Sequence, residues 1–205
     1  PGSQINAMSI EASLLRFCRN PSVMDDFVEI LEWSGNAMRI GGFDTALPFF
    51  NTLELHAQYG NNDIKAALGK ISFESAGQIG IGVLHFADIK AIVLLITFQK
   101  SEHEFSPTTM YADYPISREI LHWESQSNTT QASESGKNLT KHKERGYTIL
   151  VFVRDVKKRN GVTVPFTYLG PVNLMSYESE RPIKIIWHLR YPMPVEIFEE
   201  NRRGG

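Results

Sequence analysis

The sequence has little cysteine, no long hydrophobic run and no excess of positive charge, and each absence excludes a class of protein. Cys18 is the one cysteine in 205 residues, which excludes an internal disulfide and a zinc site built from several cysteines. The longest apolar run, Ala91 to Ile96, is too short to span a bilayer. The formal charge of −2 is unlike that of proteins that bind nucleic acid over their whole surface. We therefore expect a cytoplasmic protein with no membrane partner.

Signatures of catalysis are also missing. Ser135-Gly136-Lys137-Asn138 lacks the upstream glycine and the following hydroxyl residue of a phosphate-binding loop, and the six histidines show no metal-ligand spacing. Glu74 with Asp88 and Lys90 offers an acidic pair and a lysine for a magnesium-dependent nuclease, but such triplets arise easily by chance. We expect no catalytic residue, no metal and no cofactor, and keep the nuclease as a weaker alternative.

The predicted secondary structure changes from helices to strands near residue 70. Residues 1–7, beginning Pro1-Gly2-Ser3, look like the remnant of a protease site, and residues 8–69 form a helical segment by their apolar spacing. Helices are predicted from Ile10 to Cys18, from Val23 to Gly35, from Leu47 to Tyr59 and from Asp63 to Leu68, with Gly69 ending the last. Residues 70–197 form the β-rich domain, with strands predicted at 71–74, 82–86, 91–99, 119–125, 147–154, 164–169, 172–177 and 183–189. Many short strands favour a barrel or sandwich, so the fold class is α+β.

One long polar segment interrupts the strands. Residues 126–146 are rich in Ser, Thr, Asn and Lys, which is typical of a functional or a disordered connection. Eight basic residues fall between Lys137 and Arg159, against the two acidic residues Glu144 and Asp155. This run indicates DNA contact only weakly, because most charge runs are solvated surface.

Several short sequence motifs of this chain occur together in a known family. They are Phe105–Tyr114, Leu121–Ser127, His142–Glu144, Ile149–Arg154, Pro165–Pro171 and Arg181–Ile183 before Trp187, with a milder match at Leu55–Tyr59 and Ala66–Gly69. About residues 53–197 resemble the C-terminal domain of unknown function of bacterial DEAD/DEAH-box helicase-like proteins that carry a phospholipase-D-type nuclease domain. The chain departs from the family at Leu139, where a tyrosine is expected, and at Ser135-Gly136 in place of Thr-Gly.

The resemblance implies a function and a fold. Some members of that family are modification-dependent (type IV) restriction enzymes, in which this domain looks like the target-recognition part. Its fold there is similar to the PUA-like, SET-and-RING-associated (SRA) barrel that holds 5-methylcytosine. The resemblance thus implies a β-rich PUA/SRA-like barrel preceded by a small helical segment, with nuclease and ATPase domains elsewhere.

Reading a modified base requires flat apolar side chains around it and polar groups at its Watson–Crick edge. Aromatic and polar side chains of both kinds gather near one another in the sequence: Phe105, Thr109, Tyr111, Asp113, Tyr114, Trp123, Ser125 and Gln126. Asp113 can accept from a cytosine amino group or instead cap a turn, and Trp123 can stack on a base or pack in the core. Phosphate contact falls to Lys137, Lys141, His142, Lys143 and Arg145, with His142 either donating to phosphate or packing at the base of the loop.

We therefore expect a DNA-binding target-recognition module without catalysis of its own, which reads methylated cytosine in double-stranded DNA for a restriction or helicase system. The alternative is a protein-interaction or scaffold module of a helicase–nuclease, with no direct base reading. A third interpretation is an RNA-binding barrel.

Overall fold

The computed structural model describes residues 19–40, 53–69, 82–99 and 113–202, and the chain divides into two units, residues 1–51 and 52–205. In the first unit, helix α2 spans Pro21–Ile40. The prediction that Gly35 ends this helix is wrong, because one interior glycine costs only about 1 kcal/mol relative to alanine. The helix predicted from Ile10 to Cys18 and the strand at 71–74 lie outside the described residues.

The second unit begins with residues that were predicted to be helical. Residues 53–57 form loop and turn, and Gln58–Tyr59 form strand β1, so the prediction of helix over this part is wrong. Helix α3, Asn61–Ala67, follows at the expected place, and the Asp63 carboxylate accepts from the Gly60 amide at 2.8 Å. Gly69 has a φ of 76°, as expected for a glycine that ends a helix. These two elements belong to the same unit as the sheet, although the sequence interpretation assigned them to the helical segment.

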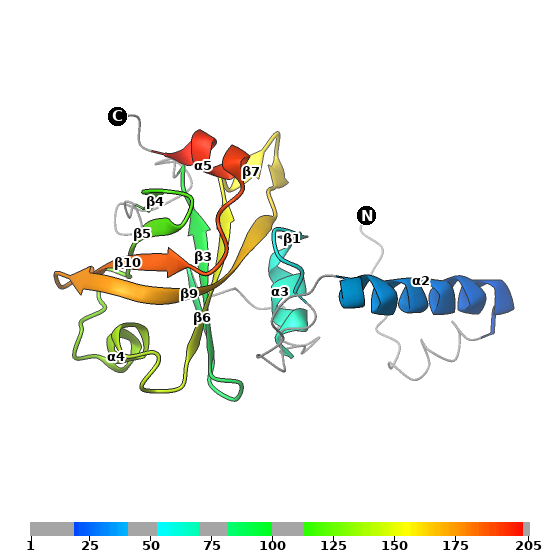
Figure 1. Cartoon of the computed structure of the whole chain (residues 1–205), viewed down its shortest axis with the longest axis horizontal. Coiled ribbons are helices and arrows are strands. Elements are labelled where there is room, and N and C mark those ends of the chain that lie inside the picture. The colour runs from blue at the N-terminus through cyan, green and yellow to red at the C-terminus, as the bar shows by residue number, and fades with distance from the viewer. Residues whose placement is uncertain (1–18, 41–52, 70–81, 100–112, 203–205) are drawn as a thin grey trace, which may run out of the picture. The chain divides into compact units, whose positions relative to one another are not determined.

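The sheet of this unit has eight strands and is open (Figure 1). In spatial order they are β2 (Val83–Phe86), β3 (Ala91–Thr97), β6 (Thr148–Arg154), β9 (Phe166–Glu178), β10 (Lys184–Leu189), β5 (Ile120–Glu124) and β4 (Tyr114–Pro115), with β1 also paired to β9. The mixed α+β class is confirmed. The closed barrel is wrong for the described residues, because the edge strands β2 and β4 do not pair with each other.

Burial follows the apolar pattern of the sequence. The continuous runs in β3 and β6 are central strands, buried almost throughout, and they pair in parallel with Ala91 opposite Thr148. In β10, Ile185 and Trp187 face the core, whereas Lys184, Ile186 and His188 face the opposite side, as the alternation predicts. The core therefore lies on one face of β5 and β10, and the other face is more exposed.

Several elements differ from the predicted ones. The two strands predicted at 164–169 and 172–177 are one strand, β9. Gly170 has a φ of 87° and lies where the pairing of β9 with β6 shifts register, between Val151 and Phe152. The strand continues through this irregularity because a bulge takes up the extra residue. A small hairpin, β7 (Lys158–Arg159) and β8 (Val162–Thr163), turns through Asn160 and Gly161, both with positive φ. Helix α5 spans Val195–Asn201. The helices within the described ranges are too short or too polar to cross a bilayer.

Candidate nucleic-acid interface

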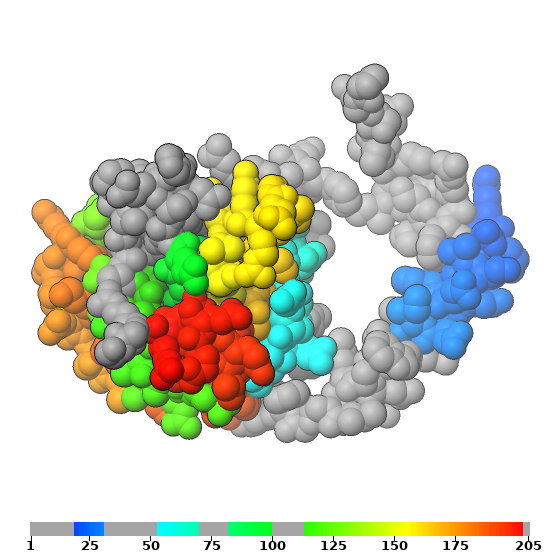
Figure 2. Space-filling model, turned by 90° about the horizontal axis from the view of Figure 1, so that it is seen from above, coloured from blue at the N-terminus to red at the C-terminus, as the bar shows by residue number. Residues whose placement is uncertain are grey.

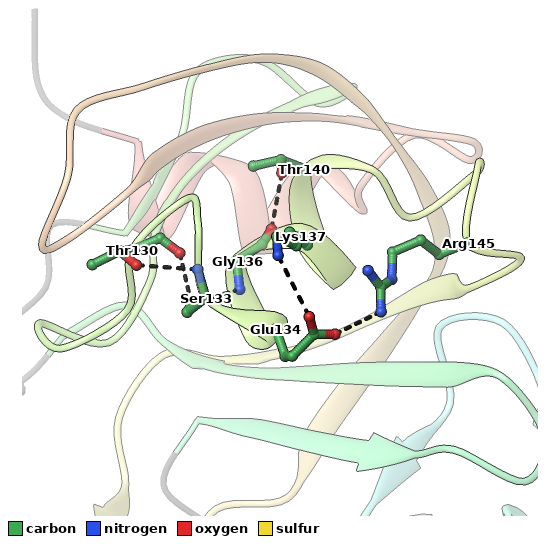
Figure 3. Close-up of polar contacts among 7 residues, drawn as sticks. All are labelled: Thr130, Ser133, Glu134, Gly136, Lys137, Thr140 and Arg145. Atoms are coloured by element: carbon green, nitrogen blue, oxygen red, sulfur yellow. Dashed lines mark hydrogen bonds and ion pairs between the residues drawn. The ribbon is translucent and has the colours of Figure 1, made fainter.

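The polar segment 126–146 folds around a short helix, α4 (Glu134–Thr140), which the apolar pattern did not predict. Local polar contacts start it (Figure 3). Ser133 caps the helix: its hydroxyl accepts from the Gly136 amide at 3.1 Å and donates to the Thr130 carbonyl at 2.6 Å. The Thr140 hydroxyl donates back to the Gly136 carbonyl at 2.9 Å. The segment is therefore ordered by hydrogen bonds rather than by a broad apolar face.

Two residues of α4 fix its place, one against the preceding turn and the other in the core. A Cβ on Gly136 would lie 1.9 Å from the Thr130 carbonyl oxygen, so only glycine fits this position. Leu139 is buried in the core cluster. The family pattern has a tyrosine at that position, but the side chain there points into the core, so the departure at Leu139 changes packing and not an exposed surface.

The outer side of α4 carries paired charges. Glu134 forms an ion pair with Lys137 (Nζ to Oε1, 3.6 Å) and another with Arg145 (Nη2 to Oε2, 2.7 Å), as Figure 3 shows. All three side chains are substantially exposed, so each pair contributes at most about 1 kcal/mol and can be exchanged for a phosphate. Lys141 and Lys143 are exposed in the turn that follows.

Lys90 joins these cations from another part of the chain. It lies in the turn between β2 and β3 with a φ of 51°, its Nζ is 4.8 Å from the centre of the Tyr147 ring, and its carbonyl accepts from the Thr148 amide at 2.8 Å. The sequence interpretation used Lys90 only in the nuclease alternative. The apolar runs of β3 and β6 pair in parallel, and this pairing places Lys90 beside Thr148. Their similar apolar pattern was the signal in the sequence that could have indicated it. We call Lys90, Lys137, Lys141, Lys143 and Arg145 the basic surface.

The remaining basic residues of the run do not belong to this surface. Strand β6 separates the two groups, and its seven residues span about 20 Å, so Lys157, Lys158 and Arg159 lie at its far end in the β7–β8 hairpin. The hairpin is exposed in the view of Figure 2, where it is yellow. Arg154 is structural: its guanidinium donates to Thr97 Oγ1 and to the Val164 carbonyl, and lies 4.1 Å from the centre of the Phe166 ring.

His142 packs at the base of the loop, the second of its two expected positions. The residue is 3% exposed, with Nδ1 3.1 Å from the Tyr147 carbonyl and Nε2 3.4 Å from the Leu174 amide. Because the carbonyl can only accept and the amide can only donate, the ring is neutral with the proton on Nδ1. Burial lowers the pKa of His142, against a smaller opposing effect of the Tyr147 carbonyl. Its assignment as a phosphate ligand is therefore not supported by its position.

Those expected base-binding residues that the structure describes lie on different sides of the sheet and do not form one pocket. Phe105, Thr109 and Tyr111 lie outside the described residues. Trp123 is buried in the core against Trp187, at 6.5 Å between ring centres, whereas Tyr114 stacks on His122 at 4.6 Å on the other side of the sheet. Successive side chains of β5 point to opposite faces of the sheet, so the Trp123–Trp187 pair and the Tyr114–His122 pair lie on different faces.

Asp113 and Ser125 hold the ends of strands. The buried Asp113 carboxylate accepts from the Glu124 amide at 3.0 Å, which joins the residue before β4 to the end of β5 and does not cap a local turn. The Ser125 hydroxyl accepts from the Ile183 amide at 2.8 Å and donates to the carbonyl of the half-buried Gln126 at 3.2 Å. Within the described ranges, no group of three or more His, Cys, Asp or Glu side chains is placed to hold a metal ion.

Comparison with known proteins identifies the family of the chain. No curated protein matches the chain. Residues 53–200 match the family described as Domain of unknown function (DUF3427), and they include the whole sheet and the basic surface. This match covers more than half of the sequence, and the chain is therefore a member of the DUF3427 family.

Proposed function

We propose that this protein is a DNA-binding target-recognition module without catalysis of its own. Its ligand is double-stranded DNA that carries a methylated cytosine. It delivers this recognition to the nuclease and ATPase domains of a larger restriction or helicase system. Support for the system and for the modified base comes from the family resemblance, which the sequence words from Phe105 to Trp187 carry.

The basic surface is the observation that carries DNA binding. Its five cations come from two separate segments, yet the β3–β6 pairing and the Lys90–Tyr147 contact bring them to one end of the sheet. Phosphate contacts fix the position of a protein on a duplex, and they need exposed cations on an ordered frame. The rest of the chain is acidic overall, which restricts the affinity for DNA to this end.

A protein-interaction module is the second candidate. Met175 and Tyr177 on β9 are 54% and 41% exposed, and both residue types are enriched at protein interfaces. This candidate predicts no affinity for DNA at low salt.

Binding of the full chain to fluorescent duplexes, measured by anisotropy between 50 and 200 mM salt, tests the proposal. Lys141 and Lys143 replaced together by alanine should weaken all duplexes alike and reduce the slope of log K against log salt by about 2, because two phosphate contacts are lost. The matched control replaces Lys157 and Lys158, two cations at the far end of β6, and should leave the slope unchanged. Absence of binding to any duplex at low salt would overturn the proposal.

A further inference from the structure

The tip of the β9–β10 hairpin is exposed and has an unfavourable backbone. Residues 175–181 are all exposed, and they end in a tight connection to β10. Ser179 and Arg181 have φ values of 65° and 56°, in the left-handed region that favours glycine. Non-glycine residues persist there only where their surroundings hold them, and such positions concentrate at functional sites.

Gln131 and Ser125, which both precede α4 in the chain, hold this tip in place. The Gln131 amide donates to Glu180 Oε2 at 2.9 Å, and its side-chain Nε2 donates to the Ser179 carbonyl at 2.9 Å. On the other side of the tip, Ser125 exchanges two bonds with Ile183: the Ser125 amide donates to the Ile183 carbonyl, and the Ile183 amide donates to the Ser125 hydroxyl. Four hydrogen bonds therefore fix a loop that presents one cation, Arg181.

The same contacts place the tip beside the basic surface. Gln131 lies just before Ser133, the cap of α4, and the seven residues of α4 span about 10 Å. In Figure 1 the tip and α4 both lie at the left of the view, with α4 below the hairpin. A duplex with its phosphates on Lys137 and Arg145 is thus within reach of Arg181.

A phosphate contact does not need a cation that is carried on so ordered a loop. The lysines of the basic surface offer charge on flexible stems, which is sufficient for a backbone contact. Glu178 and Glu180 flank Arg181 and repel phosphate, whereas carboxylates are tolerated in a groove, where they can accept from cytosine amino groups. An arginine on an ordered loop is valuable where its two-pronged geometry matters, as on the edge of a guanine.

We propose that Arg181 is a base-reading residue: Gln131 and Ser125 hold the loop that carries it, and its guanidinium enters a groove of the bound duplex and contacts a base edge. This inference rests on the proposed DNA binding and deepens it. It assigns direct reading of the duplex to the hairpin tip, beside the basic surface that binds phosphate.

Variants at the two left-handed positions test the inference, with anisotropy on a panel of duplexes that differ at single base pairs and in cytosine methylation. Arg181→Gly relieves the backbone and should raise the urea midpoint, yet it should reduce the preference between the best and the worst duplex by about 5- to 150-fold. Ser179→Gly is the matched control: it relieves the same strain, removes no cation, and should keep the preference.

Arg181→Lys separates base reading from phosphate contact. It keeps the charge, so the salt slope should stay the same while the preference is lost as in Arg181→Gly. A lysine variant with full preference, or a wild-type chain that binds every duplex of the panel equally, would overturn the role of Arg181. In both cases the Lys141/Lys143 variant still reports whether the chain binds DNA, so the two proposals fail separately.

Discussion

Replacing Gly136 with alanine should destabilise the protein, the reverse of the usual effect in a helix. Alanine is favoured over glycine in a helix interior by about 1 kcal/mol. Here the new Cβ would lie 1.9 Å from the Thr130 carbonyl oxygen and 2.8 Å from its carbon, so α4 must move away. That movement breaks the Ser133 cap, which costs about 1 kcal/mol, and crowds the packing around Leu139, which costs about 2 kcal/mol. The net loss is about 2 kcal/mol.

Urea unfolding measures this loss. Trp123 and Trp187 lie in the core near α4, and a Trp33→Phe background removes the tryptophan of the first unit, so that fluorescence reports on the second unit. With a slope of about 2 kcal/mol per molar urea, the midpoint of Gly136→Ala should fall by about 1 M. Ser135→Ala, at the exposed neighbouring position, should change it little. A Gly136→Ala midpoint equal to or above that of the parent would refute the reasoning.

Two further predictions follow from buried polar groups. Asp113→Ala should cost about 1–3 kcal/mol, because the Glu124 amide loses its acceptor, whereas Asp113→Asn keeps an acceptor oxygen and should cost less; equal urea midpoints for the two variants would contradict this role. Burial lowers the pKa of His142 in the folded state, so the unfolded chain binds more protons at acidic pH. The contribution of His142 to the free energy of unfolding is therefore fully present above the ordinary pKa of 6.5, and it is lost as the pH falls below that value. His142→Gln should flatten this dependence of the midpoint on pH, leaving the part due to His56, whose pKa burial also lowers; an unchanged slope would exclude His142 as the cause.

The parts of the fold that could be predicted are those that burial dictates. The runs at β3 and β6 had to be central strands because no polar face interrupts them, and the alternation in β10 fixed which side faces the core. Helix α4 could not be predicted in this way, because its position depends on one hydroxyl cap and one glycine contact. The continuous strand β9 was missed because Gly170 and Pro171 are residues typical of a turn.

The candidate site was harder to predict for a related reason. Eight basic residues that are close in sequence divide between the two ends of β6, and Lys90 joins one group only through a pairing of distant strands. The residues around β4 and β5 are also close in sequence, yet successive side chains of a strand point to opposite faces, which places Tyr114 and Trp123 apart. Proximity in sequence thus indicated the segments correctly, but not the surfaces that they form.

The parallel pair β3–β6 also has a consequence for how the protein reaches its native state. The chain from Thr97 to Thr148 must close into a loop before these two central strands can pair, and that loop carries β4, β5 and α4. Local contacts alone cannot build such a sheet, so folding depends on pairings between distant residues, which are slow to form. Leu139 of α4 packs in the core cluster, so the helix beside the basic surface reaches its native packing only when that core forms. A nascent or partly unfolded chain would lack the basic surface, so the DNA binding that we propose requires a folded chain.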